Sequence, residues 1–387
     1  MTRSVYEVEN VVLSLIFIVH LDRMALDGDT FLLLKIHRVQ NLIFHITRSQ
    51  GVGNLQHTVR QSTLTMVDVR NYAKVSCLLH LNICQIICKD NAFFSYFCAI
   101  MKISETMANI NELQRISTQL RRDIVRMVTS AKSGHPGGSM SSADFLTALY
   151  FEVMKHNPET WTRSGKDQDV FILSAGHLTP IYYSLLARTG YFPVSELATF
   201  RQYGSRLQGH PSIAKGLPGV FQPSGSLGQG LSLAAGIAVA KKMDKETNKV
   251  YVMMGDGECE EGQIWEAAMF AAHHKLDNLV GMVDWNGQQI DGKVDEVGGV
   301  GDLEAKFKSF GWDVIVADGH DFEEILKAYA KADELCGNGK PVMILFRSDM
   351  GHGVDFMAGT HAWHGKAPSA EQCEKALAQL EETLGDF

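Results

Sequence analysis

The first third of this chain has few of the residues that usually shape turns and domain cores. None of its nine prolines, none of its five tryptophans and only three of its 35 glycines lie within residues 1–106. That stretch has a net charge of +2. The whole chain has a net charge of −8, so residues 107–387 have a net charge of −10. We interpret residues 1–106 as an atypical N-terminal extension outside the fold, and residues 107–387 as the folded domain. Met101 or Met107 is then the expected natural start.

Long apolar runs and paired cysteines are also scarce. The run VVLSLIFIVHL (11–21) is too short to span a bilayer, and it follows Glu7 and Glu9 rather than a basic leader. The three cysteines beyond residue 106 are scattered without pairing spacing, which is typical of a reducing cytosol. A net charge of −8 disfavours nucleic acid and anionic membranes as partners. We therefore expect a cytoplasmic protein that binds neither.

One segment of the extension has a pattern that resembles a metal site. CLLHLNICQIIC (77–88) places cysteine and histidine at near-metal spacing. It lacks the glycines and turn residues that usually shape a zinc knuckle. A structural role for these residues is therefore favoured over zinc binding.

The orderly pattern begins at residue 107, and a hydrophobic content of 45% supports a substantial core. Apolar residues recur at helical spacing over 113–128, and Ser141 or Ser142 is expected to cap a helix through DFLTALYFEVM. Apolar runs typical of buried strands occupy 169–174, 250–254, 278–285, 312–317 and 341–348. Helical stretches lie between them at 178–189, 262–275 and 321–335. This alternation predicts an α/β domain with a doubly wound parallel sheet, helices on both faces, and ligand loops at the carboxyl ends of the strands.

A glycine-rich turn between a strand and a helix carries Asp256 and three further acids, in MMGDGECEEGQIWEA (253–267). Such a turn normally binds phosphate, yet these acids would repel a bare phosphate. The next strand ends at Asn286 in WNGQQIDG, so neighbouring parallel strands bring both side chains to one edge of the sheet. A carboxylate, an amide oxygen and a backbone carbonyl suit Mg²⁺ or Ca²⁺. The pattern predicts a metal ion that bridges the loop to a diphosphate.

Other interpretations of this loop fit less well. A dinucleotide fingerprint has the spacing GxGxxG with an acid about twenty residues later. Here Gly255, Gly257 and Gly262 follow GxGxxxxG, and the acid lies inside the loop. The Gly-Lys-Ser/Thr of a nucleotide P-loop is absent. An acidic turn at a helix N-terminus needs only the macrodipole to explain it, but the paired strand end NGQQIDG favours the metal.

GDGECEEG followed by WNGQQIDG resembles the thiamine-diphosphate motif, and the surrounding segments narrow the resemblance to the transketolase family. These segments occur in the family's order: SGHPGGSMSSAD (133–144), LSAGHLTPIYYSLL (173–186), GHPSIAKGLPGVFQPSGSLGQGLSLAAGIAVA (209–240) and THAWHGKAP (360–368). The resemblance covers residues 110–368 nearly continuously and excludes 1–106. It implies the thiamine-diphosphate-binding fold, with thiamine diphosphate and Mg²⁺ or Ca²⁺ as cofactors. It also implies transfer of a two-carbon ketol unit from a ketose phosphate, such as xylulose 5-phosphate, to an aldose phosphate, such as ribose 5-phosphate.

The resemblance also implies a set of site residues. The metal ligands are Asp256, Asn286 and the backbone oxygen of Gln288. The cofactor contacts are Gly225, Leu227 and Gly257, together with His177 and His364. The four active-site histidines, each in a glycine-flanked loop, are His135, His177, His210 and His364. Imidazole can both give and take a proton near neutral pH, as ketol transfer requires. Glu261 and Glu266 resemble acids that couple two cofactor sites across a subunit interface, although acids near a helix start need no further reason.

The family's second domain is not found before the sequence ends at Phe387. The resemblance therefore implies the N-terminal subunit of a split transketolase, active only with a C-terminal subunit that supplies the pyrimidine-binding domain. The expected assembly is a heterotetramer that acts on sugar phosphates. Alternative interpretations are a 1-deoxyxylulose-5-phosphate synthase-like enzyme, ketol transfer to an unusual sugar, or a non-catalytic module that keeps the cofactor fold. The glycine spacing makes a nicotinamide dehydrogenase the least favoured.

Overall fold

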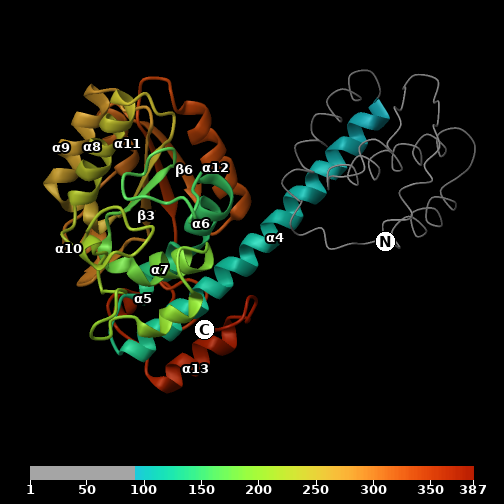
Figure 1. Ribbon diagram of the computed structural model, residues 1–387, viewed down its shortest axis with the longest axis vertical. Helices are drawn as coiled ribbons and strands as arrows, with labels where there is room; N and C mark the ends of the chain where they lie inside the picture. The colour runs from blue at the N-terminus through green and yellow to red at the C-terminus, as the bar shows by residue number, and fades with distance from the viewer. Residues whose placement is uncertain (1–91) are drawn as a thin grey trace, which may run out of the picture. The chain divides into compact units, whose positions relative to one another are not determined.

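The computed structural model describes residues 92–387, and a five-stranded parallel sheet lies at their centre (Figure 1). The strands are adjacent in the order β1-β2-β3-β7-β6. Their bounds are β1 (Val170–Leu173), β2 (Val250–Gly255), β3 (Leu279–Trp285), β6 (Asp313–Asp318) and β7 (Val342–Arg347). All five apolar runs that the sequence predicts as strands are therefore strands. In the register of β2 and β3, Gly255 lies opposite Asp284, so the ends of these two strands are level.

Helices cover both faces of the sheet because alternate strand residues point to opposite sides. Tyr251 and Met253 join one buried cluster, and Val250 and Val252 join the other. The first cluster includes α4 (Ala92–Ala131), α5 (Pro136–Ser141), α6 (Ala143–Ala148), α7 (Thr179–Arg188), α12 (Phe322–Leu335) and α13 (Ala370–Gln379). The second includes α8 (Gln229–Met243), α9 (Gly262–His273), α10 (Val294–Val297) and α11 (Leu303–Ser309). In Figure 1, α8, α9 and α11 lie on one side of the sheet and α6 and α12 on the other. The predicted doubly wound arrangement is confirmed.

Residues from Glu105 to Phe387 form one compact unit. Helix α4 runs through the predicted boundary at residue 107, and from Ile110 onward its side chains enter the core. The segments 11–21 and 77–88 lie outside the described residues. None of the helices within residues 92–387 combines the length and the apolar character needed to cross a bilayer.

Ser142 occupies the predicted N-cap position of the helix expected through DFLTALYFEVM, but its side chain makes no capping hydrogen bond. Helix α6 begins at Ala143 as expected, but it ends at Ala148 and gives way to a π-helical turn, Leu149–Val153. Because α5 ends directly against α6, Ser142 has a helical backbone (φ −82°, ψ −3°), and its hydroxyl donates back to the carbonyl oxygen of Gly138 at 2.7 Å. The Ser141 hydroxyl donates instead to the Asp284 carboxylate, at 2.5 Å.

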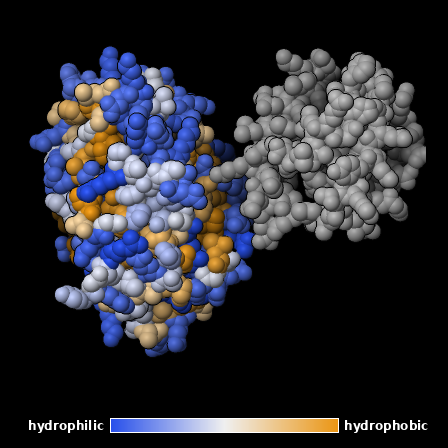
Figure 2. All heavy atoms as spheres, viewed as in Figure 1, coloured by the Kyte–Doolittle hydropathy of each residue, from blue (hydrophilic) through white to orange (hydrophobic). Residues whose placement is uncertain are grey.

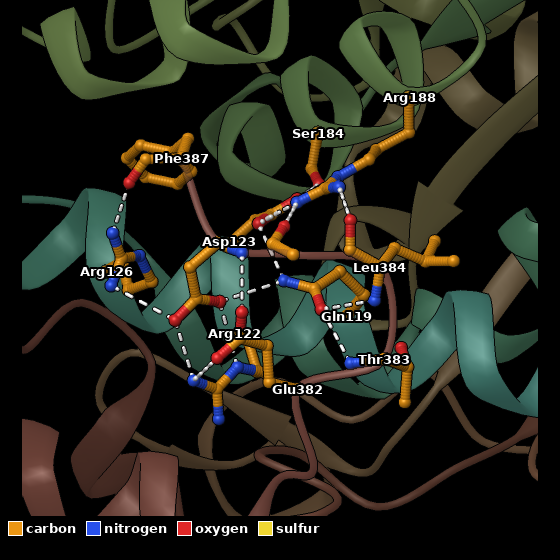
Figure 3. Close-up of polar contacts among 12 residues, drawn as sticks. Gln119, Arg122, Asp123, Arg126, Ser184, Arg188, Glu382, Thr383, Leu384 and Phe387 are labelled. Atoms are coloured by element: carbon orange, nitrogen blue, oxygen red, sulfur yellow. Dashed lines mark hydrogen bonds and ion pairs between the residues drawn. The ribbon is translucent and has the colours of Figure 1, made fainter.

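A C-terminal tail, residues 380–387, is held against α4 (Figure 3). Arg122 forms a two-point ion pair with Asp386, at 2.9 and 2.7 Å, and also donates to the Leu380 carbonyl oxygen at 2.5 Å. The side-chain oxygen of Gln119 accepts backbone N–H groups of the tail at 3.0 Å. The hydrogen bond from Arg122 is the main cause that lowers the pKa of Asp386 to about 2. The tail thus fixes the helix whose C-terminal end leads into the first histidine loop.

Candidate active site

Three of the four predicted histidines form one cluster. His135 precedes α5, His177 lies in the short 3-10 helix Gly176–Leu178, and His364 follows the 3-10 helix His361–Trp363. Their ring centroids are 5.0 Å (His135–His177), 5.7 Å (His135–His364) and 5.1 Å (His177–His364) apart. The Nδ1 atoms of His135 and His364 are buried without a hydrogen-bond partner among the described residues. Since buried polar atoms are normally paired, these nitrogens fit a site for a polar ligand.

His210, the fourth histidine, joins this group through the loop that contains Gly225. A methyl group at Gly225 would lie 3.2 Å from the Cδ2 carbon of His210, and the glycine has φ +146°, which other residues rarely adopt. The same loop packs on the His177 loop, because a methyl group at Gly176 would lie 2.5 Å from the Ser224 hydroxyl oxygen. Leu227 is half-buried in this loop, which leads into α8.

Partial burial lowers the pKa of all four imidazoles, although His210 is exposed and the other three are half-buried. It lowers the pKa of His135 to about 4, and it is also the largest cause of the lowered pKa values of His177, His210 and His364. The positive charge of Arg201 adds to the effect on His135 and His210. Neutral imidazoles can each donate and accept one hydrogen bond, so the group suits a ligand rich in hydroxyl groups.

Asp256 directly follows β2, at the edge of the sheet where β2 and β3 both end. Its carboxylate accepts the N–H of Gly257 at 2.8 Å and the N–H of Gly287 at 2.5 Å. The second bond ties Asp256 to the residue next to Asn286, as the strand order predicts. Burial, followed by the charge of Asp284, raises the pKa of Asp256 to about 7. The site therefore holds two buried acids close together.

The donor chemistry fits a hard divalent cation. Within residues 109–387, whose side chains the structure describes, neither Asp256 nor Asp284 pairs with a lysine or arginine, although the charge of His320 lowers the pKa of Asp284. The Asn286 amide oxygen, which accepts the Gln288 N–H at 2.9 Å, is the second predicted ligand. Gln288 itself begins a short hairpin of β4 (Gln288–Gln289) and β5 (Gly292–Lys293). Mg²⁺ and Ca²⁺ bind carboxylate, amide and carbonyl oxygens, so either ion would supply the positive charge that this site needs.

The hairpin connects the acidic loop to the histidine cluster. A methyl group at Gly365, next to His364, would lie 3.4 Å from the Nε2 atom of His135 and 3.9 Å from the Cδ1 carbon of Ile290. Ile290 lies in the turn of the hairpin and is 61% exposed. The hairpin that begins at Gln288 and the loop of His364 are therefore neighbours.

Two predicted contacts in the acidic loop stay predictions. The Gly257 N–H, expected to meet a phosphate oxygen, here donates to Asp256, and a methyl group at Gly257 would lie 2.7 Å from the Gln289 side-chain oxygen. Glu261 and Glu266, expected at a subunit interface, are both exposed, at the start of α9 and within it.

Several side chains next to the predicted site residues were given no role by sequence reasoning. Glu258 differs from the exposed acids of the loop because it is buried and accepts the N–H of Gly228 at 2.9 Å, the N–H of Gly255 at 3.1 Å and the Ser174 hydroxyl. Asp284 is buried inside the otherwise apolar run NLVGMVDW, and that single acid was the available signal. No comparable signal in the sequence marked Arg201.

Comparison with known proteins identifies relatives of the same kind. A family model described as "Transketolase, thiamine diphosphate binding domain" matches residues 113–385. The chain is 38% identical to one subunit of the apulose-4-phosphate transketolase of Phocaeicola vulgatus, over 71% of this chain and 96% of that protein. It is 41% identical to a 6-deoxy-6-sulfo-D-fructose transketolase subunit of a Clostridium species, over 69% of this chain and 98% of that protein.

Solved structures agree on the fold. The transketolase of Campylobacter jejuni superposes with a TM-score of 0.65 at 34% identity, covering 69% of this chain. That of Leishmania mexicana gives the same TM-score at 31% identity, covering 71% of this chain. The chain spans 42% of the length of each of these two proteins.

Proposed function

This chain belongs to the transketolase family of transferases, and on that premise we propose that it is the thiamine-diphosphate-binding subunit of a split transketolase. The observation that carries the proposal is the arrangement in which Asp256 and Asn286 are joined by one hairpin to three clustered histidines. When bound, thiamine diphosphate would supply the chemistry that breaks and forms the carbon–carbon bond.

We propose a separate role for each part of the site. Asp256, Asn286 and the backbone oxygen of Gln288 would hold Mg²⁺ or Ca²⁺, which in turn neutralises the diphosphate. Gly257 would approach the diphosphate through its N–H, Gly225 would lie beside the cofactor, and Leu227 would contact the aminopyrimidine. Glu261 and Glu266 would face a second subunit.

The histidines would handle protons and orient the sugar. His135, His177, His210 and His364 are neutral, so each can accept a proton from a sugar hydroxyl through one nitrogen while donating a hydrogen bond through the other.

The substrate class is a ketose with an anionic end group. Xylulose 5-phosphate as donor and ribose 5-phosphate as acceptor, both of the pentose phosphate pathway, are one candidate pair. The names of the relatives favour a second candidate, an unusual sugar, because one is named for apulose 4-phosphate and the other for 6-deoxy-6-sulfo-D-fructose.

A partner subunit would complete the site. The relatives named as subunits have nearly the length matched here, whereas the solved single-chain transketolases are more than twice as long. We propose a C-terminal subunit that supplies the pyrimidine-binding domain. We also propose that residues 107–387 are the functional unit, located in the cytoplasm, and that removing residues 1–106 leaves cofactor binding unchanged.

An exposed apolar face supports assembly into a heterotetramer. Apolar residues reach the surface in the region of α8 and α9 (Figure 2). Leu233, Met269 and Phe270 are 36%, 54% and 44% exposed there. Glu261 and Glu266 lie on the same helix α9 or at its start. We propose that this α8–α9 face packs against a second copy of the chain.

Reconstitution tests the proposal. The purified chain, with thiamine diphosphate and Mg²⁺, should show no ketol transfer alone and robust transfer once a C-terminal transketolase subunit is added. A panel of donors, including xylulose 5-phosphate, apulose 4-phosphate and 6-deoxy-6-sulfofructose, then identifies the sugar. Robust transfer by the chain alone would refute the split-enzyme proposal, and failure of the assembled complex to bind the cofactor would refute the proposed function.

A further inference from the structure

Asp284 is an acid in the interior of the sheet, next to the proposed metal ligand Asn286. It is 1% exposed and is the sixth of the seven residues of β3. Its carboxylate accepts hydrogen bonds from the Ser141 hydroxyl at 2.5 Å, from the Ser348 hydroxyl, and from the Asn286 amide nitrogen at 2.8 Å. These donors come from the end of α5, the residue after β7 and the loop after β3. Three separate segments thus hold one carboxylate in place.

The orientation of the Asn286 amide depends on its two neighbours. An asparagine side chain has an oxygen and a nitrogen of nearly equal size, so only hydrogen bonds determine which way each points. On one side the ionised Asp284 carboxylate can only accept a hydrogen bond, and the amide nitrogen donates to it at 2.8 Å. On the other side the Gln288 N–H donates at 2.9 Å, so it selects the amide oxygen. A flipped amide would place oxygen against carboxylate and N–H against N–H.

We propose that Asp284 is a positioning residue that fixes the Asn286 amide with its oxygen directed to the metal. The inference rests on the proposed metal site. Asp284 would act through Asn286, without contact to the ion or the sugar. Groups that orient a metal ligand from behind typically contribute 10- to 100-fold to metal affinity. The same range is expected here.

The test measures Mn²⁺ binding in place of Mg²⁺, at saturating thiamine diphosphate, by the electron paramagnetic resonance signal of free Mn²⁺. The protein is the full chain assembled with its C-terminal subunit. Asp284→Ala should weaken Mn²⁺ binding about 10- to 100-fold. Ser348→Ala is the matched control, because it removes one hydrogen bond to the same carboxylate but none to Asn286. It should change the affinity by less than about threefold.

A double-mutant cycle separates positioning from a general structural role. In an Asn286→Ala background, Asp284→Ala should cause no further loss of Mn²⁺ affinity, since its effect runs through the missing amide. Should Asp284→Ala fail to fold, Asp284→Val replaces it, because valine suits a buried strand. Thermal unfolding without metal shows which variants are folded.

The outcomes are distinct. A wild-type complex that binds Mn²⁺ together with a folded Asp284→Ala complex of equal affinity would overturn the inference and leave the proposed function standing. The inference would also be overturned if Asp284→Ala weakened Mn²⁺ binding as much in the Asn286→Ala background as in the wild type. A wild-type complex that binds no Mn²⁺ in the presence of thiamine diphosphate would overturn the metal site and this inference together.

Discussion

The contact between two loops at Gly176 makes the position of His177 testable by adding one methyl group. In Gly176→Ala that methyl would lie 2.5 Å from the Ser224 hydroxyl oxygen, 2.7 Å from the Gly225 backbone nitrogen and 2.8 Å from the Ser224 carbonyl carbon. Gly176 does not have a positive φ, so backbone strain plays no part. Two of the three atoms belong to the backbone, which cannot rotate away as a side chain can. The loops must therefore move apart.

The size of this movement sets the expected loss. Ordinary contacts begin near 3.4 Å, so the two loops must separate by about 1 Å at the contact. Overpacking of this kind costs about 1–3 kcal/mol of stability. A displacement of about 1 Å in an active site costs on the order of 100-fold in rate. Because His177 and Gly225 lie on the two loops, we expect a loss of about 100-fold in kcat/KM, accompanied by weaker binding of thiamine diphosphate.

Ketol transfer by the assembled complex, thiamine-diphosphate titration and urea unfolding measure these quantities. Gly262→Ala is the matched control, because a methyl group there meets no atom within 4 Å. It should leave all three quantities close to wild type. A folded Gly176→Ala complex with wild-type kcat/KM and cofactor affinity would show that the packing of the two loops does not position the site.

Other perturbations test the framework around the site. The guanidinium of the buried Arg121 pairs with the Asp144 carboxylate at 2.7 and 2.8 Å. Asp144→Ala removes this partner and should lower the free energy of unfolding, measured in urea, by about 3–5 kcal/mol. Burial acts to raise the pKa of Asp144, but Arg121 outweighs it and holds the pKa well below its usual range. This stabilisation should therefore be present above about pH 4 and be lost as the pH falls, which acid unfolding of the wild type and the variant would show. Phe270→Glu places a charge on the α8–α9 face and should reduce the mass of the assembled complex by half in light scattering, with unchanged circular dichroism. Asp386→Asn removes the two-point ion pair with Arg122 and should speed hydrogen exchange in the C-terminal tail. The same loss should begin in the wild type below about pH 4 and be complete as the pH falls through about 2, the pKa of Asp386 in the folded chain.

The strands were predictable because a parallel sheet covered on both faces buries most residues of its inner strands, whereas β6 is largely half-buried. Tyr251 and Val252 point to opposite cores, yet both are apolar, so the run is continuous in the sequence. Helix α8 was not predicted by its pattern. Its residues from Gly230 to Ala240 are small or apolar on the exposed face as well as on the buried one. Such a helix has no polar stripe from which its period can be read.

The sequence predicts which site residues come together, but not the hydrogen-bond partners of each side chain. Strand order alone brings Asp256 and the Asn286 loop together, and the structure confirms that contact. The different environments of Glu258 and Glu261 could not be inferred, since both acids lie in the same turn. Glu258 is buried because Ser174 and Gly228, distant in sequence, supply its donors. Tertiary contacts of this kind leave no local pattern.

The distribution of buried charge explains why this region is built for a ligand rather than for stability. Away from the site, two fully buried acids have basic partners, since Asp144 pairs with Arg121 and Asp123 pairs with Arg188. At the ends of β2 and β3, Asp256 and Asp284 are buried close enough for the charge of Asp284 to raise the pKa of Asp256. Burying two acids together without a lysine or arginine partner costs free energy that a folded core alone does not need, although the charge of His320 acts on Asp284. A bound divalent cation would offset that cost. The proposed metal would therefore take the place of a lysine or arginine partner.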